Sequence, residues 1–267
     1  MARFRLIVMR VAVSALLLAT DGAVAETPVS IISVTESINL AGRQRMLSQR
    51  MAKAYFQIGQ QIEVDRSKKV LDSSMAVFDR QLVELKNYAP TPEIKETYGK
   101  LEKSWLAYKD VLIGTAPSKE NGGKVLAISE EVLALANQGT GQLEKQSATT
   151  SGRLVNISGR QRMLSQRMAK FYQAMAWGVG DVKSAVELDK ARKEFAAAHQ
   201  ELAASPANTQ QIKDALELVK QQWFFFENAL GQKVGADKRP QIAVATSSER
   251  ILEEMESAVG LYEKLPK

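Results

Sequence analysis

The chain has 267 residues, enough for one large domain or two small ones, and its 45% hydrophobic and 25% charged residues are ordinary for a soluble globular protein. The lack of cysteine excludes disulfides, thiolate nucleophiles and cysteine-ligated metals, and the single histidine, His199, leaves little scope for imidazole chemistry. A formal net charge of +6 is too small an excess to predict a nucleic-acid partner.

Residues 1–25 have the pattern of a secretion signal. Three arginines precede an apolar run at 11–19, and Ala23-Val24-Ala25 is a small-x-small cleavage sequence. The apolar run is too short to span a bilayer securely. We therefore predict export to the periplasm with cleavage after Ala25, and a retained membrane anchor is the alternative.

One twelve-residue block occurs twice without change. Residues 42–53, with the sequence GRQRMLSQRMAK, return as residues 159–170, an offset of 117. Weaker matches continue toward the end of each copy, among them Trp105 with Trp223 and Val132-Leu133 with Ile251-Leu252. The chain after the signal is therefore a tandem duplication.

Each copy is predicted to form four helices, because apolar residues recur every three or four positions and strand-like alternation never persists. Turns rich in Pro, Gly and Asn separate them. The expected ranges are 29–65, 67–88, 92–113 and 121–147 in the first copy, and 148–179, 181–204, 208–230 and 238–264 in the second. The predicted fold class is all-α: two up-down four-helix bundles in tandem, about eight helices, with domains at 26–147 and 148–267.

The repeated block lies on a helix with two packing faces. One is an apolar stripe through Leu40, Leu47 and Met51, and the other is a seam of mostly small or polar residues with coiled-coil spacing. The seam in the first copy is Ile38, Ala41, Arg45, Ser48, Ala52, Tyr55, Gly59 and Ile62, and in the second it is Val155, Ser158, Arg162, Ser165, Ala169, Tyr172 and Ala176. An arginine thus sits at the centre of each seam.

Pairing the two seams would bring two guanidiniums together. At about 6 Å and an effective dielectric near 20 they would repel by roughly 3 kcal/mol. A small planar oxyanion between them reverses the sign, because the arginine fork matches trigonal oxygens. The expected ligand site therefore contains Arg45 and Arg162, with hydroxyl donors from Ser48 and Ser165 one turn on.

The simpler interpretation is structural. Helix arginines are usually solvated, and one in a polar seam can pair with a carboxylate. Arg43 and Arg50, which flank the apolar face, are expected to snorkel or form salt bridges. Lys53 and Lys170 are expected to face solvent.

The pattern Ile-Asn-x-Ala-Gly-x-x-Arg-Met-x-Ser-x-Arg at residues 38–50 resembles the P-box of the NarX-like sensor domain, found in nitrate/nitrite sensor kinases and in the N-terminal region of PilJ-type pilus chemotaxis transducers. The GRQRMLSQRM form is closer to the transducer branch. The resemblance implies a periplasmic four-helix bundle that binds nitrate between two copies of its first helix. The arginine before the motif methionine, Arg45 or Arg162, would bind the anion, with Gly42 and Gly159 of the motif beside it.

The sequence departs from the family in the second copy, which has Ser158 where the first has Ala41, and no kinase or methyl-accepting domain follows. It also leaves one geometric question open. A turn within residues 137–152 would let Arg45 meet Arg162 inside one chain. A continuous helix there would hold the motifs about 45 Å apart, and the sites would then need a second chain.

We therefore expect an exported sensory module that binds a nitrate- or nitrite-like anion and passes the signal to a separate membrane sensor kinase or chemotaxis transducer, with a homodimer as one arrangement. Catalytic, metal and cofactor sites are not expected, because no nucleophile elbow, phosphate loop or metal motif is present. The alternative is a helical scaffold or interaction protein of the envelope that binds no small ligand.

Overall fold

A computed structural model of the chain describes residues 32–114, 116–235 and 237–266, and this part contains eight α-helices and no strand. The first copy forms α1 (Val34–Gly59), α2 (Val64–Tyr88), α3 (Pro92–Gly114) and α4 (Lys119–Ser147). The second forms α5 (Thr150–Trp177), α6 (Val182–Ala203), α7 (Gln210–Leu230) and α8 (Arg239–Glu263). The predicted all-α fold of two helical bundles in tandem is confirmed. The predicted signal sequence, 1–25, lies outside the described residues.

The chain turns between α4 and α5, which answers the geometric question. Ala148 adopts a left-handed conformation with φ 49°, and this conformation ends α4. Thr149 then caps α5, because its side chain accepts a hydrogen bond from the backbone N–H of Gly152. α5 therefore folds back along the first copy, and the two sequence blocks lie in one packed unit.

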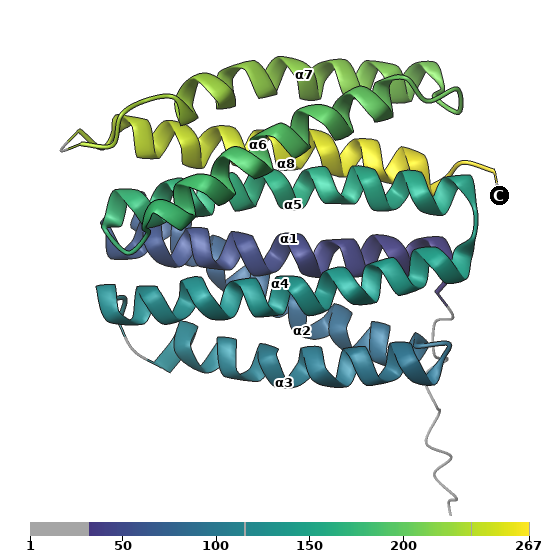
Figure 1. Ribbon diagram of the computed structural model, residues 1–267, viewed down its shortest axis with the longest axis horizontal. Coiled ribbons are helices and arrows are strands. Elements are labelled where there is room, and N and C mark those ends of the chain that lie inside the picture. Colours follow the sequence, from purple (N-terminus) through teal and green to yellow (C-terminus); the bar gives the residue numbers. More distant parts are fainter. Residues whose placement is uncertain (1–31, 115, 236, 267) are drawn as a thin grey trace, which may run out of the picture. The chain divides into compact units, whose positions relative to one another are not determined.

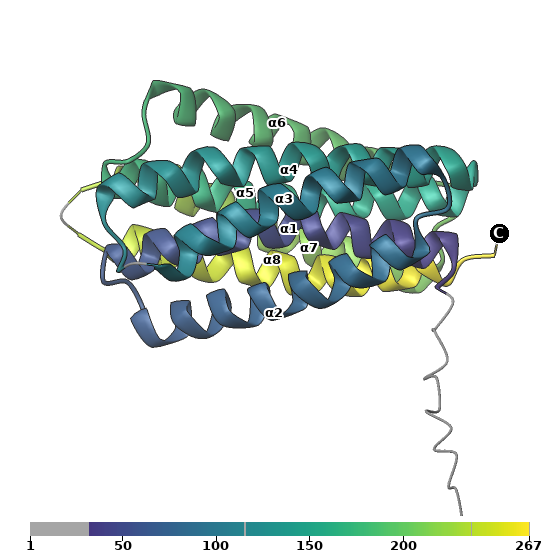
Figure 2. The same ribbon diagram turned by 90° about the horizontal axis from the view of Figure 1, so that it is seen from below.

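The two repeated helices lie side by side at the centre. α1 and α5 run in the same direction, with α4 packed against α1 and α8 against α5 (Figure 1). α2 packs on α1 and α6 on α5, at opposite edges of the second view (Figure 2), while α3 and α7 cover α4 and α8. α1 and α5 are consequently buried on almost every side, which explains why they carry both an apolar and a polar face.

Each copy has an aromatic stack in its core. Trp105 of α3 stacks on Phe78 of α2 with ring centroids 4.1 Å apart, and its indole N–H donates to Asp79 at 2.7 Å. In the second copy Trp223 stacks on Phe195 at 4.5 Å. These stacks join the outer helices α2 to α3 and α6 to α7. Among the described helices, none is long and apolar enough to cross a membrane.

Candidate functional site

Two glycines of the repeated block, Gly42 and Gly159, lie close together where α1 packs on α5. A Cβ atom built on Gly42 would lie 3.9 Å from the Cα atom of Gly159, and one built on Gly159 would lie 4.0 Å from that of Gly42. The same Cβ position on Gly42 is 3.3 Å from Nη2 of Arg45 and 3.5 Å from Nη2 of Arg162. The glycines thus let the backbones approach, and both guanidiniums meet beside them within one chain.

The predicted seam contains Ala41 and Ser158, and the structure brings together the residues that follow them, Gly42 and Gly159. These two glycines were expected beside the arginines. The small glycines leave room for the two guanidiniums, because an added Cβ would lie 3.3 Å from Nη2 of Arg45 at Gly42 and 3.1 Å from Nη2 of Arg162 at Gly159.

Arg45 is 1% exposed and takes its hydrogen-bond partners from two other helices. Its Nη2 donates to the side-chain oxygen of Asn156 at 2.7 Å and to the backbone oxygen of the same residue at 3.2 Å. Its Nη1 donates to the side-chain oxygen of Asn137 of α4 at 3.0 Å. Arg45 contacts no carboxylate among the described residues, so its charge is met by neutral oxygens.

Arg162 has the equivalent contacts in the second copy, except that one of its partners is a carboxylate. It is fully buried, and its Nη2 donates to the side-chain oxygen of Asn39 at 2.8 Å. Its Nη1 donates to Glu256 of α8, which also pairs with Arg43. The two arginines therefore exchange asparagine partners across the α1/α5 interface, as expected for a pair related by an internal two-fold axis.

A second layer of carboxylates holds the asparagines. The side-chain N–H of Asn39 donates to Glu263 at 2.8 Å, and that of Asn156 donates to Glu144. Burial lowers the pKa of Arg45 to about 9, a change that Arg160 adds to and Glu144 opposes. The asparagines thus orient their oxygens toward the guanidiniums, while the carboxylates stay one residue away.

The two serines predicted to donate to a ligand point elsewhere in this structure. Ser48 donates its hydroxyl hydrogen to the backbone oxygen of Arg45 at 2.8 Å, and Ser165 does the same to Arg162 at 2.8 Å. Both hydroxyls also accept a hydrogen bond from the following glutamine. Their observed role is to tie the turn of helix that carries each arginine.

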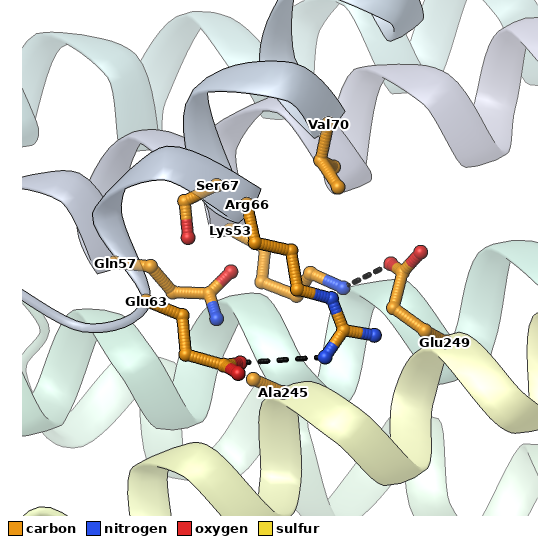
Figure 3. A pocket seen from close by; sticks show the side chains of 8 residues that line it. All are labelled: Lys53, Gln57, Glu63, Arg66, Ser67, Val70, Ala245 and Glu249. Atoms are coloured by element: carbon orange, nitrogen blue, oxygen red, sulfur yellow. Dashed lines mark hydrogen bonds and ion pairs between the residues drawn. The ribbon is translucent and has the colours of Figure 1, made fainter.

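The prediction that Lys53 and Lys170 face solvent is wrong. Lys53 is 1% exposed and donates to Gln166 at 2.7 Å and to Glu249 at 2.5 Å, beside a cavity of about 10 Å³ between α1, α2 and α8 (Figure 3). Lys170 is fully buried and pairs with Glu130. Each lysine is covered by helices of the other copy, so a residue that its polarity suggests is exposed is buried in the structure.

Arg43 and Arg50 behave as predicted, since both form salt bridges at the edge of the core. Arg43 pairs with Glu256, and Arg50 makes a forked contact with Glu249, in which its Nε lies 3.1 Å from both carboxylate oxygens. Glu249 therefore carries two cations, Arg50 and the buried Lys53.

The pH dependence of stability should reflect this carboxylate. Burial raises the pKa of Glu249, but Lys53 and Arg50 outweigh it and bring the pKa from 4.5 to about 2. A lowered pKa stabilises the fold above the unfolded value, and this contribution, about 3 kcal/mol, is lost as pH falls from 4.5 toward 2. Urea unfolding of wild type and Glu249→Gln at several pH values should show a difference that narrows toward pH 2. A difference that does not change with pH would contradict this assignment.

The profile of the family described as the N-terminal region of type IV pili methyl-accepting chemotaxis transducers, PilJ, matches residues 31–126 and again residues 145–249. The chain belongs to the PilJ family. Its two matches coincide with the two copies, so a PilJ domain occurs twice in one polypeptide. The comparisons with curated proteins and with solved structures give no match.

The PilJ site contains residues that the sequence reasoning did not single out. Asn39 and Asn156 are the nearest partners of the arginines, and they occupy the same position in the two copies, at the offset of 117. The presence of asparagine at the same position in both copies could have identified these two residues from the sequence. Asn137 and Glu256 correspond by the offset of 119 that relates Val132 to Ile251, but their residue types differ, so identity between the copies could not reveal them.

Proposed function

We propose that this PilJ protein is a sensory input module that takes up a small planar oxyanion, nitrate or nitrite, at the α1/α5 pair, and that it does so in the periplasm. The supporting observation is the meeting of two buried guanidiniums, Arg45 and Arg162, beside Gly42 and Gly159. Like charges held this close in a desolvated interface favour the binding of an anion. The signal would pass to a separate membrane kinase or transducer.

The ligands already present on the guanidiniums fit this proposal. Asn137 and Asn156 offer trigonal amide oxygens to Arg45 at 3.0 and 2.7 Å. A nitrate oxygen is also a trigonal acceptor, and hydrogen bonds to an ion are roughly twice as strong as those between neutral groups. An anion can therefore replace an amide oxygen with similar geometry and a stronger interaction.

Binding would reach the rest of the module through the packing of the central pair. The helix pair that holds the arginines is also packed against α2, α4, α6 and α8. A change in the spacing of α1 and α5 would move those helices, since a close-packed core transmits displacement. The helices thus provide a route from the anion to an outer surface that a partner can read.

A second candidate function is a helical scaffold that binds no small ligand. It is favoured by one observation: all four Nη atoms of the two arginines already have protein partners. A polar network in which every Nη atom is paired can serve only to fix the register of two helices. The two candidates differ in whether an anion stabilises the protein.

Thermal unfolding with nitrate and nitrite separates them. A four-atom ligand is limited to about 6 kcal/mol, or tens of micromolar affinity. At 10 mM such a ligand adds at most about 3 kcal/mol, which raises the melting temperature by several degrees. Chloride and sulfate at equal ionic strength serve as controls. No shift in the wild type would favour the scaffold.

Variants locate the effect. Arg45→Gln should lose the nitrate shift, and Arg45→Lys, which keeps the charge but not the planar fork, should bind at least tenfold more weakly. Arg80→Gln is the matched control, because Arg80 lies on the surface and its ion pair with Glu84 is long, at 3.9 Å. Circular dichroism checks that each variant is folded. A full shift in both Arg45 variants would place any anion site elsewhere.

A further inference from the structure

The two halves of the arginine pair differ in one position. Asn137 of α4 accepts from Nη1 of Arg45, and Glu256 of α8 accepts from Nη1 of Arg162. They are equivalent residues of the two copies, related by the same offset of 119 as neighbouring core positions. A neutral amide thus stands in one half where a carboxylate stands in the other.

This difference changes the charge balance of the halves. Glu256 neutralises Arg162 by direct contact and also binds Arg43. Arg45 has no carboxylate in contact among the described residues, and Glu144 reaches it only through Asn156. The Nε atoms of both arginines are buried without a partner in the described part of the chain, so the carboxylate of Glu256 is what distinguishes the halves. A buried cation without an anionic partner is costly, so the Arg45 half gains most from an added anion.

Arg45 is buried, but one of its hydrogen-bond partners, Asn137, lies at the surface. Asn137 is exposed and lines a surface groove of about 280 Å³ between α4, α5 and α6. Its lining includes three cations, Arg160, Arg167 and Lys190, and an equal number of glutamates, which pair with Arg160 and Arg167. Rotation of one exposed side chain, that of Asn137, would uncover Nη1 of Arg45 from this groove.

We infer that the module is one-sided: the oxyanion enters through the α4/α5/α6 groove, takes the place of the Asn137 oxygen on Arg45, and leaves the Arg162–Glu256 pair closed. This inference rests on the proposed function and adds the position, the route and a stoichiometry of one anion per chain. Asn137 is a positioning residue whose side chain competes with the ligand. In the other half, the carboxylate of Glu256 occupies the place that the anion would take on Arg45.

Exchanging the two residues tests the inference with matched variants. Calorimetric titration with sodium nitrate should give one site in the wild type. Asn137→Glu should bind at least tenfold more weakly and melt at a higher temperature without nitrate, because it supplies the missing carboxylate. Asn137→Ala should bind several-fold more tightly, since no amide needs to be displaced. Glu256→Asn should melt at a lower temperature and bind a second nitrate.

The outcomes separate the inference from the proposed function. A wild type that binds no nitrate overturns both. A wild type that binds nitrate, with Asn137→Glu binding equally well or with two sites per wild-type chain, overturns the one-sided site and leaves the proposed function intact. The Asn137→Ala variant is expected to fold, because Asn137 is exposed. It therefore tests the inference even if Glu256→Asn is too unstable to be measured.

Discussion

Replacing Glu249 with glutamine is expected to lower the free energy of unfolding by about 3–5 kcal/mol, the usual loss when one partner of a buried ion pair is removed. Glu249 is 9% exposed and is the carboxylate in contact with both Lys53 and Arg50. Lys53 would keep Gln166 at 2.7 Å and Ser248 at 3.1 Å, but both are neutral. Equilibrium unfolding in urea at pH 7 measures the loss.

The duplicate site supplies the control. Glu130→Gln removes the equivalent partner of Lys170, but the Glu130 side chain is 35% exposed and Arg167 keeps Glu187 at 2.7 Å. Solvent can replace part of what is lost, so the destabilisation should be smaller. Adding Lys53→Met to Glu249→Gln should recover most of the loss, because the buried charge is gone. Equal losses at the two glutamates, or no recovery in the double variant, would refute this explanation.

The fold was predictable because its signals are local. Helical periodicity and the Pro, Gly and Asn clusters are read within a few residues, so the expected ranges agree closely with α1 to α8. The choice of Arg45 and Arg162 as neighbours was also within reach, since duplication implies a pair of like helices that can face each other. What periodicity could not predict was the turn at Ala148, because no proline or glycine stands at that residue.

The partners within the site were not predictable in the same way. Lys53 and Glu249 are 196 residues apart, and only the packing of α8 beside α1 brings them together. A polar residue on a helix is ordinarily read as exposed, so the sequence favoured solvent for Lys53. Similarly, Asn137 and Glu256 matter because they differ, whereas the repeat was recognised through identity. Tertiary contacts, not local pattern, determine these charges.

Widening the glycine contact should separate the central helices. A Cβ added at Gly42 would lie 3.3 Å from Nη2 of Arg45, and one added at Gly159 would lie 3.1 Å from Nη2 of Arg162. Gly42→Val and Gly159→Val add two further carbons at these positions. Each substitution should cost about 1–3 kcal/mol in overpacking, measured by urea unfolding. The guanidiniums can shift at their ends, but the opposing glycine backbone cannot, so the helices must move apart.

Valine at Gly99 and Gly141 is the matched control, because a Cβ at either helical glycine meets nothing within 4 Å. These variants should be neutral or slightly stabilised, since valine is a better helix former than glycine. The two variants at the glycine contact should keep a nitrate shift, because the one-sided site uses Arg45 and does not need the two arginines to converge. If the variants at Gly42 and Gly159 have the same free energy of unfolding as the control variants, then the close approach of α1 and α5 does not hold the arginine pair together. A stability loss at the glycine contact together with a lost nitrate shift would instead show that the anion needs both arginines.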